Sequence, residues 1–115
     1  MPESHLFDAN RLAWQPHPQL RDILIKPLAT QATHPGASVL LVQLAAGGMI
    51  ARHVHEQASE TALVLAGEGM LTLGSSEIAL QPGSGVTVAP GTPHSLRNTG
   101  DIPLELIAVH SPSLL

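Results

Sequence analysis

Apolar and polar residues alternate along much of the chain, in short segments that glycine and proline residues separate. A period of two residues is typical of a strand with one buried face, and no window of helical length shows a clear 3.6-residue stripe. We therefore predict strands at residues 22–26, 38–45, 49–55, 61–65, 70–73, 77–80, 86–88, 95–98 and 102–110. Many short strands between Gly/Pro turns indicate an all-β sandwich or barrel.

Proline residues set the limits of two regions. The first predicted strand stops at Pro27, because proline lacks the backbone N–H that a sheet needs. Before it, Pro2, Pro16 and Pro18 interrupt residues 1–20, which we expect to form an arm that packs across a neighbouring surface. A disordered tail is the alternative, but it would leave the apolar side chains of this segment in water. The expected organisation is an N-terminal arm at residues 1–20 and one barrel domain at residues 21–115.

Composition narrows the class of protein. A chain of 115 residues suits a single core, and its only Phe, Tyr or Trp residues are Phe7 and Trp14, so that core must be aliphatic. Cysteine is absent, which excludes disulfides and thiolate chemistry. The net charge is −4 with five scattered Lys and Arg residues, so nucleic acid is not an expected partner. No apolar run approaches the roughly 20 residues that span a bilayer, and the first residues do not read as a signal peptide, so we expect a cytoplasmic protein without a membrane partner.

Metal-binding side chains gather in the segment from Gly47 to Gly69. Residues two apart on a strand share a face, so His53 and His55 should project together. Glu60 follows after a short polar connection that could turn its carboxylate back towards them. His94, held by a proline-rich turn just before a predicted strand, is a fourth candidate. Imidazole and carboxylate are common ligands of divalent metals.

Each histidine also has a simpler interpretation, because a single histidine near an apolar strand is more often a hydrogen-bonded structural residue. His5, His17 and His34 lie in loop contexts and are interpreted as ordinary loop residues. His110 ends the last predicted strand, where it is either a proton shuttle at the barrel mouth or an exposed strand-end residue. For the four candidate ligands, the structural interpretation would have to explain four separate coincidences.

Two motifs in the chain resemble those of the cupin family. The first cupin motif, G-x5-H-x-H-x4-E-x6-G, matches at every position, and the second, G-x5-P-x-G-x2-H-x3-N, matches except at its proline, where Ala89 stands and proline follows one place later. That difference concerns the stiffness of a turn and leaves the ligand set intact. The matching residues are Gly47, His53, His55, Glu60 and Gly67 in the first motif, and Gly83, Gly91, His94 and Asn98 in the second.

The resemblance implies a small jelly-roll barrel, a double-stranded β-helix similar to RmlC. It also implies one divalent metal ion per chain, held by His53, His55, Glu60 and His94. Three neutral imidazoles and one carboxylate leave the ion with a net positive charge, and an octahedral metal keeps two positions open for water, dioxygen or an anionic chelating substrate. Iron, manganese, nickel, zinc, cobalt and copper all fit this donor set.

Two further residues are candidates for contact with a substrate. Gln43 is a polar interruption of an apolar strand, and a polar residue at such a position is either paired or functional. Asn98 shares the strand face of His94, where it could touch substrate or help to close the barrel. The sequence has no tyrosine or cysteine, so Glu60, His94 and metal-bound hydroxide are the available bases. Isomerases and epimerases of related fold generally need a dedicated His/Tyr pair, which makes that class less suitable.

We expect a metal-dependent enzyme of the dioxygenase, decarboxylase or lyase type, acting on a small chelating organic acid or enol-type substrate. The alternatives are a non-catalytic module that binds or senses a small ligand or metal, and a barrel whose metal only stabilises it. The strands at 38–45 and 103–109 carry more apolar side chains than one interior needs, so we also expect a homodimer that covers the excess.

Overall fold

The computed structural model describes residues 4–115 and contains ten strands and no helix within that range. The all-β prediction is confirmed. The strands are β1 (Gln15–Pro16), β2 (Ile23–Ala29), β3 (Ser38–Leu44), β4 (Met49–His53), β5 (Ser59–Ala66), β6 (Gly69–Leu73), β7 (Ser76–Leu80), β8 (Gly85–Val88), β9 (His94–Asn98) and β10 (Leu104–Ser111).

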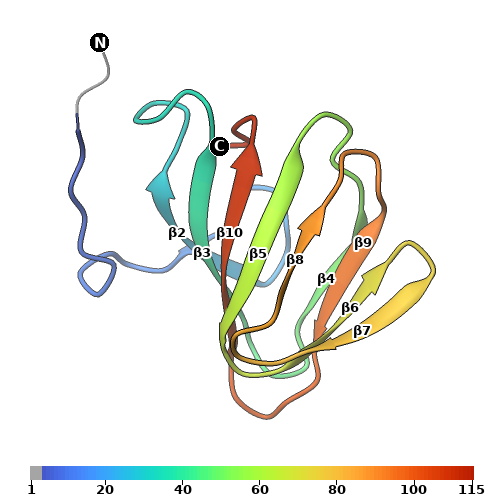
Figure 1. Ribbon diagram of the computed structural model, residues 1–115. Coiled ribbons are helices and arrows are strands. Elements are labelled where there is room, and N and C mark those ends of the chain that lie inside the picture. The colour runs from blue at the N-terminus through green and yellow to red at the C-terminus, as the bar shows by residue number, and fades with distance from the viewer. Residues whose placement is uncertain (1–3) are drawn as a thin grey trace.

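The strands form two antiparallel sheets that face one another as a jelly-roll barrel (Figure 1). One sheet has the order β1-β2-β3-β10-β5-β8 and the other the order β4-β9-β6-β7. The last strand of the chain, β10, lies between β3 and β5 and pairs with both. No helix within residues 4–115 is long and apolar enough to cross a membrane.

Alternation along the strands sends one set of side chains inward. On β10, Leu104, Leu106, Ala108 and His110 are buried, while the residues between them are only partly covered. The interior is aliphatic, as the composition predicts, with leucine, isoleucine and valine from both sheets in one cluster. Burial of each such side chain stabilises the fold by roughly 1.5–3 kcal/mol.

The glycine that ends the first motif is required by a close approach between backbones. Gly67 has φ +82°, and a Cβ there would lie 2.7 Å from the carbonyl oxygen of Pro103. Any other residue would therefore be strained by its φ angle and blocked by the chain that leads into β10. The turn fixes where β5 ends and where β10 begins.

Several strand boundaries differ from the prediction. β2 continues through Pro27 to Ala29, because β1 pairs only with Leu24 and Ile25 and leaves the rest of β2 as an edge, where proline is tolerated. β4 ends at His53, so His55 lies in the connection that follows, and β5 already contains Glu60. The N-terminal region, where no strand was predicted, contributes the two-residue strand β1.

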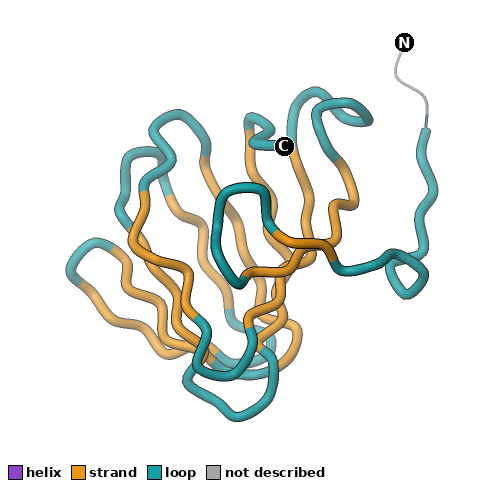
Figure 2. Tube along the Cα trace, turned by 180° about the vertical axis from the view of Figure 1, so that it is seen from behind, coloured by secondary structure: helices purple, strands orange, loops and turns teal. Residues whose placement is uncertain are grey.

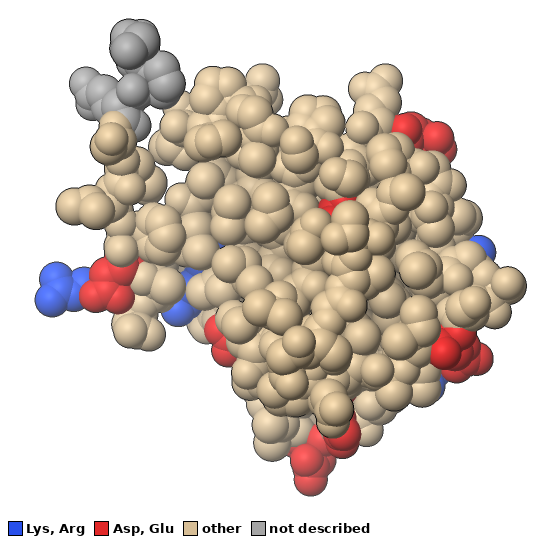
Figure 3. All heavy atoms as spheres, in the orientation of Figure 1, with Lys and Arg blue, Asp and Glu red and all other residues tan. Residues whose placement is uncertain are grey.

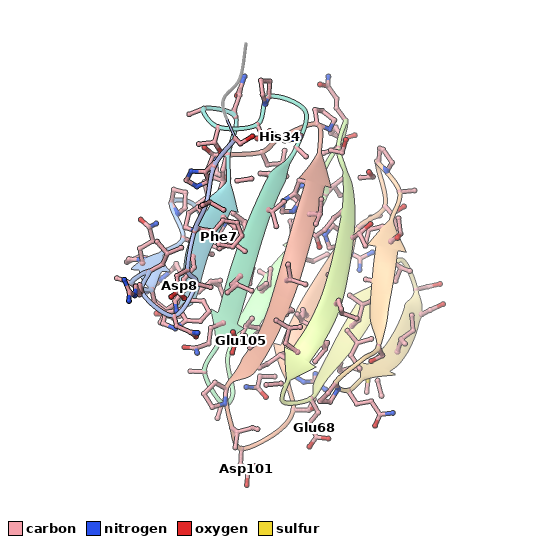
Figure 4. All side chains as sticks on the ribbon, turned by 60° about the vertical axis from the view of Figure 1, so that its left-hand side comes forward. Phe7, Asp8, His34, Glu68, Asp101 and Glu105 are labelled. Atoms are coloured by element: carbon pink, nitrogen blue, oxygen red, sulfur yellow. The ribbon has the colours of Figure 1, made fainter. Side chains whose placement is uncertain are left out.

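The segment before β1 runs along the side of the barrel where β2 lies (Figures 1 and 4). The Lys26 ammonium group donates a hydrogen bond to the carbonyl oxygen of Ala9 (2.7 Å) and lies 4.7 Å from the centre of the Trp14 ring. These two contacts connect the segment to the barrel through a nearly buried lysine. Phe7, labelled in Figure 4, is half exposed.

Candidate metal centre and cavity

Strand pairing brings the candidate ligands together from four separate parts of the chain. His53 ends β4 and lies opposite His94, the first residue of β9. Glu60 is the second residue of β5 and lies opposite His110 on β10. His55, two residues beyond β4, completes the group. The two sheets thus each supply one pair, and the connection from β4 to β5 supplies the fifth side chain.

The imidazole rings lie close enough to share one ion. The ring centroid of His53 is 4.2 Å from that of His94 and 4.8 Å from that of His55, and those of His55 and His94 are 5.2 Å apart. His55 Nε2 lies 3.5 Å from Glu60 Oε1, and His94 Nε2 lies 3.9 Å from Glu60 Oε2. Ligand atoms of His53, His55 and His94 all lie within 4.8 Å of one another, and so do those of His55, Glu60 and His110.

Backbone carbonyl groups fix the tautomers of two of these rings. His53 Nδ1–H donates to the carbonyl oxygen of Ala51 (2.8 Å), and His94 Nδ1–H donates to that of Thr92 (2.9 Å). The second nitrogen, Nε2, therefore carries a free lone pair in both rings. A hydrogen bond of this kind from the distal ring nitrogen is typical of histidine ligands, because it orients the ring and raises its basicity.

Two buried nitrogen atoms lack the partner that burial normally demands. His55 Nε2 and His94 Nε2 are inaccessible to solvent and have no hydrogen-bond partner among the described residues. A buried polar atom without a partner costs about 1–3 kcal/mol. A divalent cation bound at these lone pairs would remove that cost, so the donor set of His53, His55, His94 and Glu60 fits a first-row metal ion.

His110 is buried, and its interpretation as an exposed strand-end residue is wrong. Only 7 % of its surface is accessible, and its Nε2–H donates to Glu60 Oε1 at 2.5 Å. Its Nδ1 lies 3.5 Å from the hydroxyl of Ser38, which is completely buried. The alternation of Leu104, Leu106 and Ala108 on the same face contained the signal, since it continues inward to position 110.

The surroundings hold Glu60 in its charged form. Burial raises the pKa of Glu60, but the hydrogen bond from His110 and the nearby imidazole of His55 outweigh it, with a further contribution from His94, so the pKa lies well below its usual range. Burial also lowers the pKa of His53, and the neighbouring His94 and His55 add to this against an opposing hydrogen bond to Ala51. A carboxylate beside an uncharged imidazole is the protonation state that metal binding requires.

The structure does not bring the two predicted substrate residues into the cavity beside the cluster. Gln43 lies on the face of β3 opposite to Leu40 and Val42, which line the cavity. The Asn98 side chain is 3 % exposed and holds backbone groups: its amide donates to the carbonyl oxygens of Leu44 (3.1 Å) and Ile102 (2.9 Å), and its oxygen accepts from Gly100 N–H (2.9 Å).

The histidine and glutamate cluster forms one pole of an interior cavity of about 250 Å³. The rest of the wall is mainly aliphatic and comes from both sheets, and none of the described residues that line it is Lys or Arg. Members of this aliphatic wall include Leu40, Val42, Ala62, Val64, Leu106 and Ala108. The arrangement can hold a small molecule with its polar end at the cluster.

Two segments outside the sheets also reach this cavity. The loop between β1 and β2 contributes His17, Gln19 and Leu20, and the end of the chain contributes Leu114 and Leu115. In Figure 2 that loop lies in the foreground, between its two strands. His17 is predicted to be an ordinary loop residue, since nothing in its proline-rich context reveals that the loop folds over the barrel interior.

Comparison of sequences identifies relatives of known name. The chain is 30 % identical over 83 residues to the oxalate-binding protein of Thermotoga maritima, which covers 71 % of this chain and 69 % of that protein. It is 31 % identical over 81 residues to mannose-1-phosphate guanylyltransferase of Klebsiella pneumoniae. That match covers 70 % of this chain but only 17 % of the enzyme's own length.

Comparison of structures identifies the same fold. A predicted oxalate decarboxylase of Thermotoga maritima superposes with a TM-score of 0.86 and 23 % identity, covering 94 % of this chain and 99 % of that one. KdgF from Halomonas sp. gives a TM-score of 0.84 and 21 % identity, covering 96 % and 94 %. The sequence profile described as Cupin domain matches residues 40–110, most of the barrel. The chain therefore belongs to the cupin family.

Proposed function

We propose that the protein is a metal-dependent cupin that binds a small chelating organic acid or enol-type molecule and acts on it as an enzyme of the dioxygenase, decarboxylase or lyase type. The observation that carries the proposal is the pair of buried, unpartnered Nε2 atoms of His55 and His94 beside Glu60, at the polar pole of an aliphatic cavity. One relative is named an oxalate-binding protein, and one structural neighbour is described as a predicted oxalate decarboxylase, so chelating carboxylates fit both names.

In this proposal His53, His55, His94 and Glu60 hold one divalent metal, which supplies a Lewis acid that polarises a bound carbonyl or carboxylate group. The carbonyl groups of Ala51 and Thr92 keep His53 and His94 in the tautomers that present Nε2. Glu60 Oε1 is held by His110, which leaves Oε2 on the side of His94. The aliphatic wall excludes water from the bound molecule.

Glu60 acts in this scheme as a ligand and not as a proton carrier. The pKa of a general base or acid normally lies near the working pH. The pKa of Glu60 lies far below that range, because the hydrogen bond from His110 and the nearby imidazole of His55 stabilise its charge. Glu60 would therefore bind a proton too weakly to transfer one at neutral pH, and the proton acceptor must be sought elsewhere in the site.

The second candidate function is a non-catalytic module that binds a small ligand or the metal itself. It is favoured by the cavity wall, where the only side chains of described residues able to exchange a proton are His17 and those of the cluster. The name of the Thermotoga maritima relative, an oxalate-binding protein, also agrees with it.

Metal analysis of protein purified without chelators tests the shared part of both candidates. We expect about one equivalent of a first-row divalent metal per chain, and its loss in the variant His53→Ala. A metal-free preparation, together with unchanged thermal stability of that variant, would contradict the ligand assignment. Oxygen uptake or product formation with catechols, diketones and keto acids then supports the enzyme, whereas a redox-inert metal and a silent panel support the binding module.

We also propose that the protein forms a homodimer through the outer face of the six-stranded sheet. On β5, Leu63 and Leu65 point away from the interior and are 41 % and 46 % exposed. On β10, the outward residue Ile107 lies opposite Leu63, and Val109, which also points outward, lies opposite Thr61. Figure 4 shows this face in front, with Glu105 near its lower end, and Figure 3 shows Lys and Arg scattered on the face it displays, without a basic patch.

A further inference from the structure

His17 is held in one orientation by the loop that carries it. Its ring nitrogen Nδ1 accepts hydrogen bonds from the backbone N–H groups of Gln19 (3.0 Å) and Leu20 (3.1 Å). Its own backbone N–H donates to the carbonyl oxygen of Ile23 (2.8 Å), which ties the loop to the start of β2. The ring is half buried and lines the cavity.

These contacts determine which ring nitrogen carries the proton. A nitrogen that accepts from two N–H groups has no hydrogen of its own, so in the neutral ring the proton is on Nε2. Burial lowers the pKa of His17, and the nearby His110 and His53 lower it further, which keeps the ring neutral at pH 7. His17 therefore has the opposite tautomer to His53 and His94: they present a lone pair at Nε2, and it presents a donor.

Donors are scarce in this cavity. The Nδ1–H groups of His53 and His94 are bound to carbonyl groups, and the Nε2–H group of His110 is bound to Glu60. Among the described lining residues, the side chains with a free N–H group outside the cluster are His17 and Gln19. Among the described lining residues, a negatively charged ligand would thus find no ammonium or guanidinium group, and outside the cluster only these two neutral donors.

The wall also limits the body of the ligand. A volume of about 250 Å³ far exceeds one water, roughly 30 Å³, and lies just below the range of small-molecule pockets, roughly 300–1,000 Å³. The wall of Leu, Val, Ile and Ala side chains offers no partner to a second charged end. An apolar body behind a single polar head is the shape that satisfies both conditions.

We propose that the ligand is a 2-oxo carboxylate with a short branched aliphatic chain, and that His17 is a specificity-determining residue whose Nε2–H donates to its carboxylate. This inference rests on the proposed metal-dependent function. A 2-oxo acid that chelates a metal through its keto oxygen and one carboxylate oxygen leaves the other carboxylate oxygen free. In a cavity without cationic side chains, that oxygen needs a neutral donor, and a hydrogen bond to a charged oxygen is among the stronger ones.

The experiment measures calorimetric binding to the zinc-loaded full chain, because zinc has no redox chemistry to consume the ligand. The probes are oxalate, pyruvate and 4-methyl-2-oxopentanoate, the last two with the same chelating head. We expect 4-methyl-2-oxopentanoate to bind at least tenfold more tightly than pyruvate, since it buries three more carbon atoms. The variant Ala62→Leu, which narrows the cavity wall, should reduce that preference by weakening 4-methyl-2-oxopentanoate binding more than pyruvate binding. Equal affinities for the two acids would overturn the assignment of an aliphatic body.

Two variants of His17 separate its donor role from its role in the loop. In His17→Asn the short amide oxygen can still accept from the backbone N–H groups two and three residues on, but no donor stands at the Nε2 position. In His17→Gln the amide nitrogen reaches that position. We expect His17→Asn to weaken 4-methyl-2-oxopentanoate binding about tenfold or more with zinc content unchanged, and His17→Gln to stay within about threefold of the wild type.

The failures of the two proposals can be distinguished. If wild-type protein binds neither zinc nor any of the three acids, the proposed function is wrong, and this inference is wrong with it. If zinc and oxalate bind, but His17→Asn and His17→Gln bind 4-methyl-2-oxopentanoate equally, the donor role of His17 is wrong while the metal-dependent function stands. Thermal unfolding of both variants shows whether the loop is retained, a readout that does not depend on activity.

Discussion

His53 and His94 face each other across β4 and β9, with ring centroids 4.2 Å apart, and both are held in the same way by the backbone just before them. Each ring donates Nδ1–H to the carbonyl oxygen of the residue two positions earlier, Ala51 in β4 and Thr92 in the turn before β9. Two ring orientations and two tautomers are thus set by local backbone, independently of any bound ion. The two rings are therefore pre-organised for a metal ion, which lowers the entropic cost of binding it.

Replacement of His94 by alanine should abolish metal binding, because His94 Nε2 is one of the two buried lone pairs without a partner. We expect metal content near zero after purification without chelators, and a thermal midpoint that no longer rises when zinc is added. His34→Ala, in the exposed loop between β2 and β3, is the matched control and should retain both properties. Full metal occupancy of the His94 variant would remove it from the ligand set.

Replacement of His110 by phenylalanine should weaken both the fold and the metal site. The change removes the hydrogen bond to Glu60 and leaves a partly buried carboxylate without its main donor. We expect a loss of about 1–3 kcal/mol in the free energy of unfolding of the metal-free protein, and a drop of about 10–100-fold in zinc affinity. Urea unfolding and competitive chelator titration measure the two effects, and His34→Phe is the control. An unchanged zinc affinity would show that Glu60 is oriented without His110.

The metal-free protein should lose stability as the pH falls. The pKa of His53 is lowered below its unfolded value of 6.5, so the stability tied to the neutral ring is present above that pH and is lost on acidification through it. The pKa of Glu60 is lowered from an unfolded value of 4.5, so the stability tied to its charge is present above pH 4.5 and is lost below it.

Thermal midpoints of metal-free protein between pH 8 and pH 3 check this dependence. For a domain of this size, each kcal/mol lost should lower the midpoint by about 4–8 °C. In Glu60→Gln the fall below pH 4.5 should be shallower than in the wild type, whereas Glu77→Gln, on the exposed strand β7, should follow the wild type. A midpoint that rises on acidification would contradict the assigned charge states.

Replacement of Asn98 by alanine should destabilise the fold and spare the site. The side chain makes three hydrogen bonds to backbone groups around the loop that leads into β10. Their loss in a buried position should cost about 3 kcal/mol in the free energy of unfolding, with metal content and affinity for 2-oxo acids unchanged in the folded variant. Selective loss of ligand affinity at unchanged stability would instead place Asn98 in the binding site.

The proposed dimer predicts that light scattering finds a mass near twice the 12.0 kDa of one chain. The double variant Leu63→Glu and Leu65→Glu places charges on the apolar outer face of β5 and should give a monomer with an intact metal site. Ile78→Glu, an exposed apolar position on the other sheet, is the control and should remain a dimer. A wild-type monomer at micromolar concentration would contradict the proposal.

The barrel and its cluster could be predicted because they depend on local patterns. Period-two alternation defined the strands. The spacing of His53, His55, Glu60 and His94 matched the motifs of the cupin family, and membership of that family implies the jelly-roll fold. The predictions that failed concern residues whose position depends on contacts with distant parts of the chain. Pro27 continues β2 because its neighbour β1 is too short to need its N–H. His110 reaches the cavity on β10, where the inward alternation of Leu104, Leu106 and Ala108 continues to position 110. His17 reaches it through the return of a loop, which leaves no mark in the local sequence.

The position of β10 has a consequence for how the protein is made. The ribosome releases β3 and β5 well before β10, yet β10 is the strand that lies between them. During synthesis the larger sheet therefore remains split along its middle. Until β10 is in place, Glu60 lacks its hydrogen bond from the His110 imidazole. Domains of this kind complete their folding as units after the last strand emerges. A nascent chain cannot capture an ion at a finished site before β10 has emerged, so metal loading must follow the pairing of β10 with β5.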